Sequence, residues 1–373
     1  MNILHVINIY FSLSYFGNQF LHFHKKGYNE HVICSPSEFL LEYAQRQHIK
    51  YKEVPINRKI SISDDVKAIR EVYKYIKANN IDIVEGHTPK GALIGMIAAW
   101  LARVPKRLYF RHGLVYETSK GLKRFILITC DRVTAWCATQ VVCVSPSVLE
   151  ISIKDKLGRK SKQRILGKGT CGGVDTQNLF NPDNVDKQEI DALRNSLGIK
   201  KDDFVIGFTG RLVKDKGIIE LIRAFNMLQD REHLKLLLVG LFEERDALPE
   251  DVQTSILNAK DIIYTGFING GMEKYYSLMN VYVLPSYREG FPTGVLEAQS
   301  LALPILTTKA TGCIDSILDG KTGLFITHEP EDIAKKIDMI RCENAIDGKN
   351  GREWVVKNFD NHLIWDEIEQ LYQ

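Results

Sequence analysis

The first half of the chain alternates short apolar runs with segments of helical periodicity. Buried strands of a parallel sheet read as near-continuous apolar runs, whereas an amphipathic helix repeats its apolar positions every three to four residues. Gly27 follows one helical pattern as a C′ glycine, and Ser63 with two aspartates begins another. This pattern predicts strands at 3–9, 30–35, 81–85, 107–111 and 141–145, and helices at 16–26, 39–47, 64–78 and 91–101.

The second half repeats the alternation after a stretch without periodicity. Residues 171–200 contain Pro182 and several Asn and Asp, which is typical of a connection between domains. The spacing of the apolar residues in the tail indicates a terminal helix over 354–373. Between these segments the pattern predicts strands at 204–209, 234–239, 281–284, 304–307 and 323–326, and helices at 218–228, 252–258 and 272–278.

The repeated strand–helix order predicts an α/β fold with two Rossmann-like, doubly wound domains that face each other across a cleft. A chain of 373 residues is too long for one ordinary core, which agrees with two domains. We expect the first domain at 1–170, a linker at 171–200, the second domain at 201–354, and a helix at 355–373 that packs back on the first domain. Ligands of such sheets bind beyond the carboxyl ends of the strands, so functional residues should follow strands.

The composition is that of a soluble globular protein, with 45% hydrophobic and 25% charged residues. The sequence contains no run of about 18 apolar residues that would span a bilayer. Its start, MNILHVINIY, lacks the charged and small-residue regions of a signal peptide and reads as a strand. The seven cysteines are scattered and form no CxxC pair, which favours reduced thiols in the cytoplasm and argues against a structural zinc site.

The net charge of +3 conceals an asymmetry between the two halves. Residues 1–170 carry 27 Lys and Arg against 13 Asp and Glu, whereas residues 171–373 carry 22 against 33. This indicates that the first half faces an anionic partner, although drift in surface composition is the alternative. A nucleic acid is a poor candidate, because aromatic residues are not interleaved over a basic platform.

A basic loop follows the strand predicted at 204–209. Gly210 allows a sharp turn there, and Arg211 and Lys216 place a guanidinium and an ammonium group near the end of the strand. Two such cations suit a pyrophosphate ligand. A solvated basic loop without a ligand is the alternative interpretation.

A second candidate segment, REGFPTGVLEA at 288–298, places two glutamates around a turn. Thr293 is expected as the N-cap of a helix whose free amides at 293–296 would hold a phosphate. Glu297, in the first turn, is positioned to accept hydrogen bonds from the hydroxyls of a ribose, and Glu289 from those of a sugar on the other side of the diphosphate. Alternatively, both acids only stabilise a helix start.

With these segments, the sequence resembles the retaining glycosyltransferases of family 4, which have the GT-B fold. The matching stretches are TGRLVKDKG, SYREGFPTGVLEA with its E-x7-E spacing, LALPILTTKATGCIDSILDGKTGLF, the interdomain GGVD, and GHTPKGALIGMIAAWLARVPKRLYFRHG. They are distributed over nearly the whole chain. Each motif is weak alone, but their combination is specific.

The resemblance implies a role for each matching residue. Arg211 and Lys216 would contact the diphosphate, Glu289 would bind the donor sugar and orient its anomeric carbon, and His112 would lie at the catalytic centre near that sugar. Taken alone, His112 is more simply read as a packed histidine at the end of a strand. The resemblance also implies donor binding by Phe291, Pro292, Thr293, Gly294, Val295, Leu296 and Glu297.

Two segments depart from the family pattern. The turn after the first strand, at 9–17, is usually rich in glycine, but here it is aromatic and contains only Gly17. It is either an ordered aromatic wall or a loop that closes with substrate. Gly172 occupies the position of a family asparagine in the interdomain motif, which puts the hinge contact of that asparagine in doubt.

The resemblance implies transfer with retention of configuration, in which the leaving phosphate takes the proton of the acceptor. No DxD-type carboxylate pair follows a strand, and Arg211, Lys216 and helix amides can neutralise a diphosphate, so we expect activity without a metal or other cofactor. The resemblance implies a UDP-sugar donor of the N-acetylhexosamine or hexose class.

The acceptor is expected on the first domain. Lys120, Lys123 and Arg124 flank the apolar stretch 125–128, which suits an anionic membrane surface and a polyprenyl-diphosphate-linked saccharide. The resemblance to enzymes of capsule and O-antigen synthesis implies the same acceptor, and with it a peripheral location on the inner face of the plasma membrane. Alternatively, 125–128 belongs to a core helix.

Two other functions stay open from the sequence. A nucleotide-sugar epimerase can share this fold but needs an acid and a base that face the sugar. A non-catalytic protein that binds a nucleotide-sugar is the third possibility. Product formation separates transfer from epimerisation.

Overall fold

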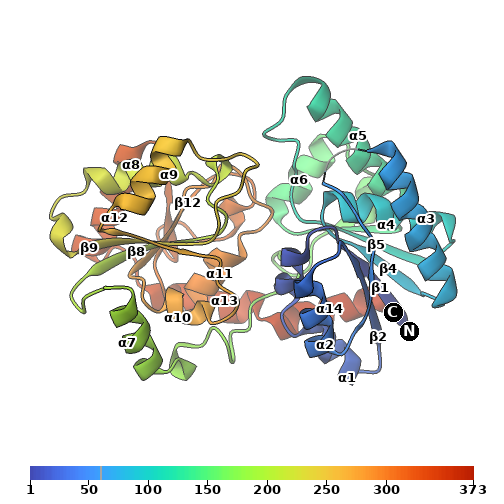
Figure 1. Ribbon diagram of the computed structural model, residues 1–373, viewed down its shortest axis with the longest axis horizontal. Coiled ribbons are helices and arrows are strands. Elements are labelled where there is room, and N and C mark those ends of the chain that lie inside the picture. Colours follow the sequence, from blue (N-terminus) through green and yellow to red (C-terminus); the bar gives the residue numbers. More distant parts are fainter. Residues whose placement is uncertain (59–60) are drawn as a thin grey trace. The chain divides into compact units, whose positions relative to one another are not determined.

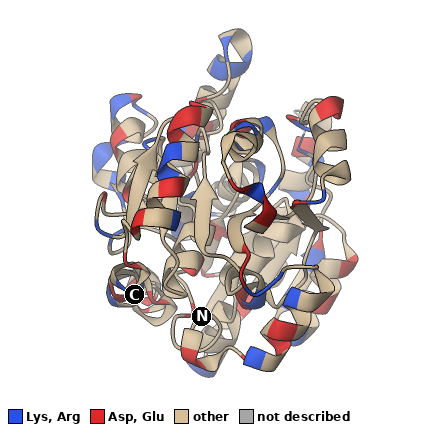
Figure 2. Ribbon diagram, turned by 90° about the vertical axis from the view of Figure 1, so that its left-hand side faces the viewer, with Lys and Arg blue, Asp and Glu red and all other residues tan. Residues whose placement is uncertain are grey.

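The computed structural model describes residues 1–58 and 61–373 and contains two compact units. Unit 1 consists of Met1–Gly172 together with Ile364–Gln373, and unit 2 of Gly173–Leu363. Each unit is a parallel sheet with helices on both faces (Figure 1). Lys, Arg, Asp and Glu lie mainly on helices and loops, while the strands at the centre carry few charges (Figure 2).

The sheet of unit 1 has seven parallel strands in the order β3-β2-β1-β4-β5-β6-β7. Its central strands are covered on both faces, so nearly all of their residues are buried, including the polar His5, Glu30 and Glu85. The strands are β1 Asn2–Val6, β2 Asn29–Cys34, β3 Lys50–Glu53, β4 Ile83–Gly86, β5 Lys106–Arg111, β6 Gln140–Cys143 and β7 Gln163–Arg164.

Helices of unit 1 cover the two faces of this sheet (Figure 1). One core contains apolar residues of α3 to α6, and the other face packs against α1, α2 and α14. In α14, Ile364, Trp365 and Ile368 are buried against strands of unit 1. The helices are α1 Gln19–Lys25, α2 Glu38–Gln47, α3 Ile62–Ala78, α4 Pro89–Leu101, α5 Gly121–Cys137, α6 Pro146–Lys154 and α14 Asn361–Tyr372.

The sheet of unit 2 has six parallel strands in the order β10-β9-β8-β11-β12-β13. The strands are β8 Phe204–Thr209, β9 Leu234–Val239, β10 Ile262–Gly266, β11 Val281–Leu284, β12 Ile305–Thr308 and β13 Gly323–Ile326. In Figure 1, α8, α9 and α12 lie on one side of this sheet and α10, α11 and α13 on the other. The helices are α7 Lys187–Ser196, α8 Ile218–Met227, α9 Glu250–Asn258, α10 Met272–Tyr276, α11 Thr293–Ser300, α12 Pro330–Glu343 and α13 Gly348–Phe359.

The structure differs from the predicted elements in a few places. The prediction of one helix over 354–373 is wrong, because α13 ends at Phe359 and α14 begins at Asn361. The side chain of Asp360 accepts hydrogen bonds from Thr176 and from the amide of His362, which fixes the break. Helix α7 occupies residues that we expected to belong to the linker.

Both sheets have a point at which the strand order reverses. In unit 1 it lies between β1 and β4, and in unit 2 between β8 and β11. Open α/β sheets bind ligands outside the carboxyl ends of the strands at such a point. The segments after these four strands are therefore the expected ligand-binding segments.

Candidate functional site

Two loops of unit 2 meet at the reversal point of its sheet. One follows β8 and contains Lys216, and the other follows β11 and contains Glu289. Gly217 has a φ of +72°, and a Cβ at this position would lie 2.1 Å from the carbonyl oxygen of Pro285. Only glycine therefore lets the two loops approach so closely.

Asp215 fastens these loops together. Its carbonyl oxygen accepts a hydrogen bond of 2.9 Å from the amide of Tyr287, and its carboxylate forms an ion pair of 2.9 Å with Arg288. This contact brings the predicted residues Lys216 and Glu289 together, and their side chains form an ion pair. The two side chains are 16% and 13% exposed, so both reach the surface of the site.

The other predicted cation, Arg211, lies at the exit of β8. Its side chain is 49% exposed and forms an ion pair of 2.8 Å with Glu243, in the segment after β9. Glu243 was not predicted from the sequence. Because β9 lies beside β8, a polar residue that follows β9 is positioned to contact Arg211. A half-exposed guanidinium is a suitable contact for an anionic ligand.

The helix start at α11 corrects one prediction. Pro292 is the N-cap and Thr293 is the first helical residue, and no side chain caps this end. Proline has no side-chain acceptor, so the first amides of α11 lack the cap that a threonine would supply. Phe291 is buried, with its ring 5.4 Å from that of Phe359. Val295 is also buried, and its amide donates to the carbonyl oxygen of Pro292 at 3.1 Å.

Glu297 lies just beyond the first turn of α11, not within it as expected, and hydroxyl groups hold its carboxylate. The hydroxyl of Tyr276 donates to Glu297 Oε2 at 2.8 Å and lies 2.8 Å from Thr209 Oγ1, which in turn lies 3.0 Å from the hydroxyl of Tyr282. A Cβ at Gly294 would lie 2.7 Å from the Tyr282 hydroxyl, so glycine is required there. Burial raises the pKa of Glu297, opposed by the hydrogen bond from Tyr276.

The sequence analysis missed both tyrosines of this cluster. The available signal was a tyrosine within the apolar run of β11, where a hydroxyl needs a buried partner. Three features lie in the segments after β8 and β11. They are the ion pair of Lys216 and Glu289, the start of α11 without a side-chain cap, and the carboxylate of Glu297. This set offers a cation, amide donors and carboxylate acceptors to one polar, anionic ligand.

In unit 1, His112 directly follows β5 and is partly buried. Its Nε2 atom lies 3.1 Å from Nδ1 of His87, and its Nδ1 atom lies 3.4 Å from Sγ of Cys171. His87 in turn contacts Glu85 and His5, which lie at the exits of β4 and β1. The sequence analysis missed these partners, although the quoted motif contained the Gly-His-Thr-Pro that follows β4.

Burial and charge give these histidines different protonation states. Burial alone would lower the pKa of His5, but the charges of Glu85 and Glu30 raise it to about 10. Burial lowers the pKa of His112 to about 3, with a further contribution from His87. His5 is therefore protonated at neutral pH, whereas His112 is neutral.

The loop after β1 is ordered and aromatic, which was one of the two expectations for it. Residues Tyr10–Phe16 form a 3-10 helix, in which the rings of Tyr10 and Phe11 lie 4.1 Å apart and Phe16 is buried. A Cβ at Gly172 would lie 2.6 Å from the carbonyl oxygen of Tyr15. The asparagine of the family motif therefore does not fit at this position with the loop as it stands.

The segment with Lys120, Lys123 and Arg124 forms the start of α5, with Lys120 as its N-cap. Leu122, Phe125 and Trp136 point to solvent, with 74%, 64% and 62% of their surfaces exposed. Ile128 is buried, so the alternative of a core helix holds for one face of α5 only. Arg124 lies over the ring of Tyr116 at 5.1 Å and 3.7 Å from Asp155.

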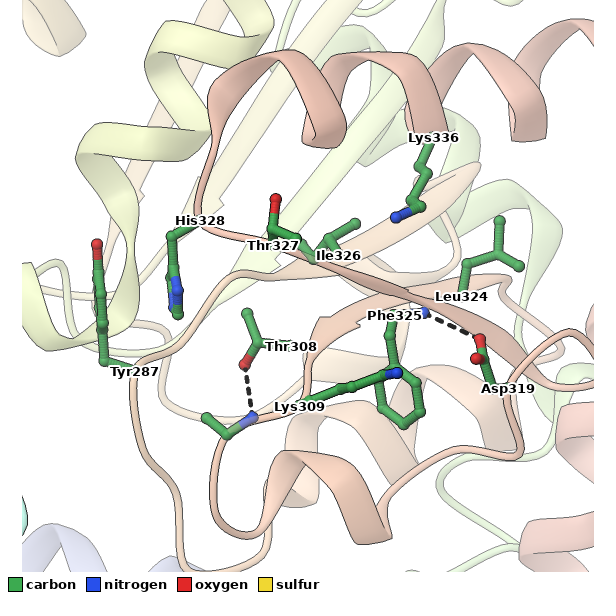
Figure 3. Close-up of a pocket in the computed structure, with 11 residues that line it drawn as sticks. Tyr287, Thr308, Lys309, Asp319, Leu324, Phe325, Ile326, Thr327, His328 and Lys336 are labelled. Atoms are coloured by element: carbon green, nitrogen blue, oxygen red, sulfur yellow. Dashed lines mark hydrogen bonds between the residues drawn. The ribbon is translucent and has the colours of Figure 1, made fainter.

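A pocket of about 710 Å³ lies elsewhere in unit 2, along β12 and β13 (Figure 3). At one end of the pocket, the rings of Tyr287 and His328 stack at 3.7 Å. Lys309 and Lys336 lie on opposite sides of the pocket. Its lining includes Tyr287 but none of the predicted site residues. The sequence analysis did not predict this pocket.

Two groups of described residues have side chains that converge closely enough to hold a metal ion. One consists of His5, Glu85 and His87 in unit 1, and the other of Asp202, Asp203 and His233 in unit 2. The second group is largely exposed and lies at the amino ends of β8 and β9, opposite the loops described above. Within residues 1–58 and 61–373, no helix has both the length and the apolar character needed to cross a bilayer.

Comparison with known proteins agrees with the resemblance found in the sequence. Residues 4–144 match the family described as glycosyl transferase 4-like, and residues 189–351 match glycosyl transferases group 1. The chain is 31% identical over 376 residues to the capsular polysaccharide biosynthesis glycosyltransferase CapM of Staphylococcus aureus, which covers 99% of this chain and 96% of the relative.

A second relative is the UDP-Gal:alpha-D-GlcNAc-diphosphoundecaprenol alpha-1,3-galactosyltransferase of Escherichia coli, 27% identical over 350 residues, or 91% of this chain and 88% of the relative. The fold matches that of Anabaena HepE, solved in complex with UDP and glucose, with a TM-score of 0.79 at 20% identity over 99% of this chain and 98% of that chain. The chain therefore belongs to the glycosyltransferases of the glycosyl transferase 4-like and group 1 families, with the GT-B fold.

Proposed function

We propose that this enzyme transfers a sugar from a UDP-sugar to a lipid-linked saccharide in the synthesis of a bacterial surface polysaccharide, with retention of configuration. The observation that carries the proposal is the cluster of Lys216, Glu289 and Glu297 at the reversal point of the unit 2 sheet. Cation, helix amides and carboxylates occur there in the order that a diphosphate between two hydroxyl-bearing sugars requires.

In this proposal the donor lies along the segment after β11. The diphosphate contacts Lys216, Arg211 and the first amides of α11, which favour negative charge. Glu297, fixed by the hydroxyl of Tyr276, accepts hydrogen bonds from the ribose. Glu289 accepts hydrogen bonds from the transferred sugar. The relative from Escherichia coli is named for a UDP-Gal donor, and HepE was solved with UDP and glucose, which supports uridine as the base.

The transfer step needs stabilisation of the leaving diphosphate. As the bond to the anomeric carbon breaks, negative charge grows on the phosphate oxygen, and Lys216 and Arg211 stabilise it without a metal ion. The acceptor hydroxyl attacks from the same face of the sugar, and its proton passes to the departing phosphate. His112 contributes near the sugar, as its position at the exit of β5 and the family resemblance support.

The acceptor in this proposal is a polyprenyl-diphosphate-linked saccharide at an anionic membrane surface. The E. coli relative is named for a diphosphoundecaprenol acceptor, and the S. aureus relative for capsular polysaccharide. Leu122 and Phe125 project from α5 beside Lys120 and Lys123, a pattern that suits peripheral binding to the inner face of the plasma membrane.

The test is nucleotide release from a panel of UDP- and GDP-sugars, with a polyprenyl-diphosphate saccharide as acceptor and EDTA present. Wild type is compared with Glu289→Ala and Glu297→Ala, and with Glu331→Ala as a matched control at an exposed glutamate of α12. We expect acceptor-dependent release from one UDP-sugar that is lost only in the first two variants. Nucleotide release that both substitutions leave unchanged would overturn the proposal. Conversion of the donor sugar to an epimer, without transfer to the acceptor, would identify an epimerase.

A further inference from the structure

A continuous chain of buried polar side chains runs through unit 1 to His112. It begins at Glu30 on β2, passes through His5 on β1 and Glu85 on β4, and reaches His112 through His87. These first four residues are between 0% and 4% exposed. His5 and Glu85 lie on the two strands that flank the reversal point of the unit 1 sheet, yet the transfer mechanism described above uses none of these four residues.

The raised pKa of His5 and the distances around it together assign the protons. His5 Nε2 lies 2.8 Å from Glu30 Oε2, and His5 Nδ1 lies 3.3 Å from Glu85 Oε2. Both ring nitrogens of His5 therefore donate to carboxylates. His87 Nε2 lies 3.2 Å from the same Glu85 oxygen and also donates to it. The 3.3 Å between His5 Nδ1 and His87 Nε2 is then the separation of two donors that share one acceptor.

Burial lowers the pKa of His87, so we assign a neutral ring to it and derive its tautomer from these contacts. Since the Nε2 atom of a neutral His87 carries the proton, its Nδ1 atom is an acceptor, and His112 Nε2 donates to it over 3.1 Å. His112 Nδ1 is then an acceptor, and the thiol of Cys171 faces it at 3.4 Å. Burial, together with the charge of Glu85, raises the pKa of Cys171 to about 12, so the thiol keeps its proton.

Packing holds the ring of His87 in this orientation. The ring stacks on Phe110 with 4.9 Å between centroids and meets the edge of Phe16 at the same distance. The next residue, Thr88, has φ 62° and ψ 152°, a conformation that a β-branched residue rarely adopts. Its hydroxyl donates to Asn8 Oδ1 at 2.6 Å, which supports the strained turn.

We propose that Glu85 and His87 are positioning residues that fix His112 as a neutral ring with its proton on Nε2, so that its Nδ1 atom accepts a hydrogen bond from a hydroxyl of the substrate. This inference rests on the proposed function. A thiol is a weak donor, and a sugar hydroxyl replaces it at Nδ1. His112 therefore orients a hydroxyl and neither removes nor supplies a proton during transfer.

The direct test is nuclear magnetic resonance of the full chain labelled with ¹⁵N-histidine. We expect a protonated Nε2 and an unprotonated Nδ1 for His112, unchanged from pH 6 to pH 9. The signal is assigned by its loss in His112→Gln. A His112 ring that titrates in this range, or that carries its proton on Nδ1, would overturn the inference. This readout does not depend on transfer activity, so it stands apart from the test of the proposed function.

The second test uses substitutions of His87. His87→Phe keeps a flat ring but removes both hydrogen bonds, whereas His87→Gln keeps an amide donor and a carbonyl acceptor. We expect His87→Phe to lower kcat about 10- to 100-fold, which is typical of a misplaced catalytic group, and to add an acid limb to the pH profile. His87→Gln should restore part of the loss. His24→Phe, at an exposed position, is the matched control.

Two outcomes would contradict the positioning role. Equal kcat losses and unchanged pH profiles in the Phe and Gln variants would indicate that His87 only fills space. Equimolar zinc in wild type, retained after dialysis against EDTA and lost in His87→Phe, would assign His5, Glu85 and His87 to a metal site instead.

Discussion

Lys216 and Glu289 form an ion pair across the exits of β8 and β11, although 73 positions separate them in the chain. The contact depends on the close approach of Gly217 to Pro285, so the fold presents a cation and a carboxylate together at the reversal point of the sheet. A ligand that carries both negative charge and hydroxyl groups satisfies both side chains. The first prediction follows from this pair.

Substitution Lys216→Met should reduce both activity and stability. The loss of a cation from the leaving diphosphate should lower kcat by about 10²–10³-fold. The mostly buried Glu289 loses its partner, which should reduce the free energy of unfolding by about 1–3 kcal/mol. Urea denaturation and steady-state kinetics measure the two effects. The double variant Lys216→Met/Glu289→Gln should be less destabilised than the sum of the single changes, and strict additivity of the stability losses would refute the coupling.

Tyr276→Phe should weaken donor binding through Glu297. It removes the hydroxyl that donates to Glu297 Oε2, so the carboxylate is no longer held for the ribose. We expect a rise of about 5- to 10-fold in the donor KM, equivalent to one hydrogen bond. Tyr282→Phe is the matched control, because its hydroxyl contacts Thr209 and lies one step further from Glu297. An equal effect of both substitutions would show that the cluster acts only through packing.

Membrane binding should depend on the exposed face of α5. Phe125→Ser and the charge reversal Lys123→Glu should each reduce sedimentation of the protein with vesicles that contain anionic lipid, because they remove apolar contact and surface attraction respectively. Leu257→Ser, at an exposed leucine of unit 2, is the control for the loss of an apolar side chain. If all three variants sediment like wild type, α5 is not the membrane contact.

The contribution of the buried His5 to the free energy of unfolding should depend on pH. Because the folded state raises its pKa from 6.5 to about 10, its protonated form stabilises the fold fully below pH 6.5, and this contribution is lost as the pH rises to about 10. The difference in unfolding free energy between wild type and His5→Gln should therefore shrink with pH, by up to about 1.4 kcal/mol per unit. Urea denaturation at pH 6.5, 8 and 9.5 measures it. A difference that stays constant or grows would show that His5 is neutral in the fold.

The fold was predictable from the sequence because its central strands are buried on both faces. The short runs of β8 and β11 are almost entirely apolar and end at turn residues, which is typical of buried strands. The edge strand β3, with the sequence KYKE, is largely exposed and was missed, since polar edge strands carry no such signal. The break at Asp360 was missed because the apolar spacing continues across it while one side chain fixes the turn.

The residues of the unit 2 site were predictable in part. Lys216, Glu289 and Glu297 follow strands and carry charge, so chemistry and position together made them candidates. Tyr276 and Tyr282 look like core residues in the sequence, and their role depends on where their hydroxyl groups end. In unit 1, His112 was identified by resemblance, but its hydrogen-bond partners lie on other strands, and no local spacing reports such contacts.

The measurement that tests the central claim most directly is calorimetric titration of UDP into the full chain. Wild type is compared with Lys216→Met, Glu297→Ala and the control Glu331→Ala. We expect UDP to bind to wild type and to the control alike, and at least about 10-fold more weakly to the other two, because each loses a charged contact to the nucleotide. Equal affinity in all four proteins would place the nucleotide elsewhere and contradict the account.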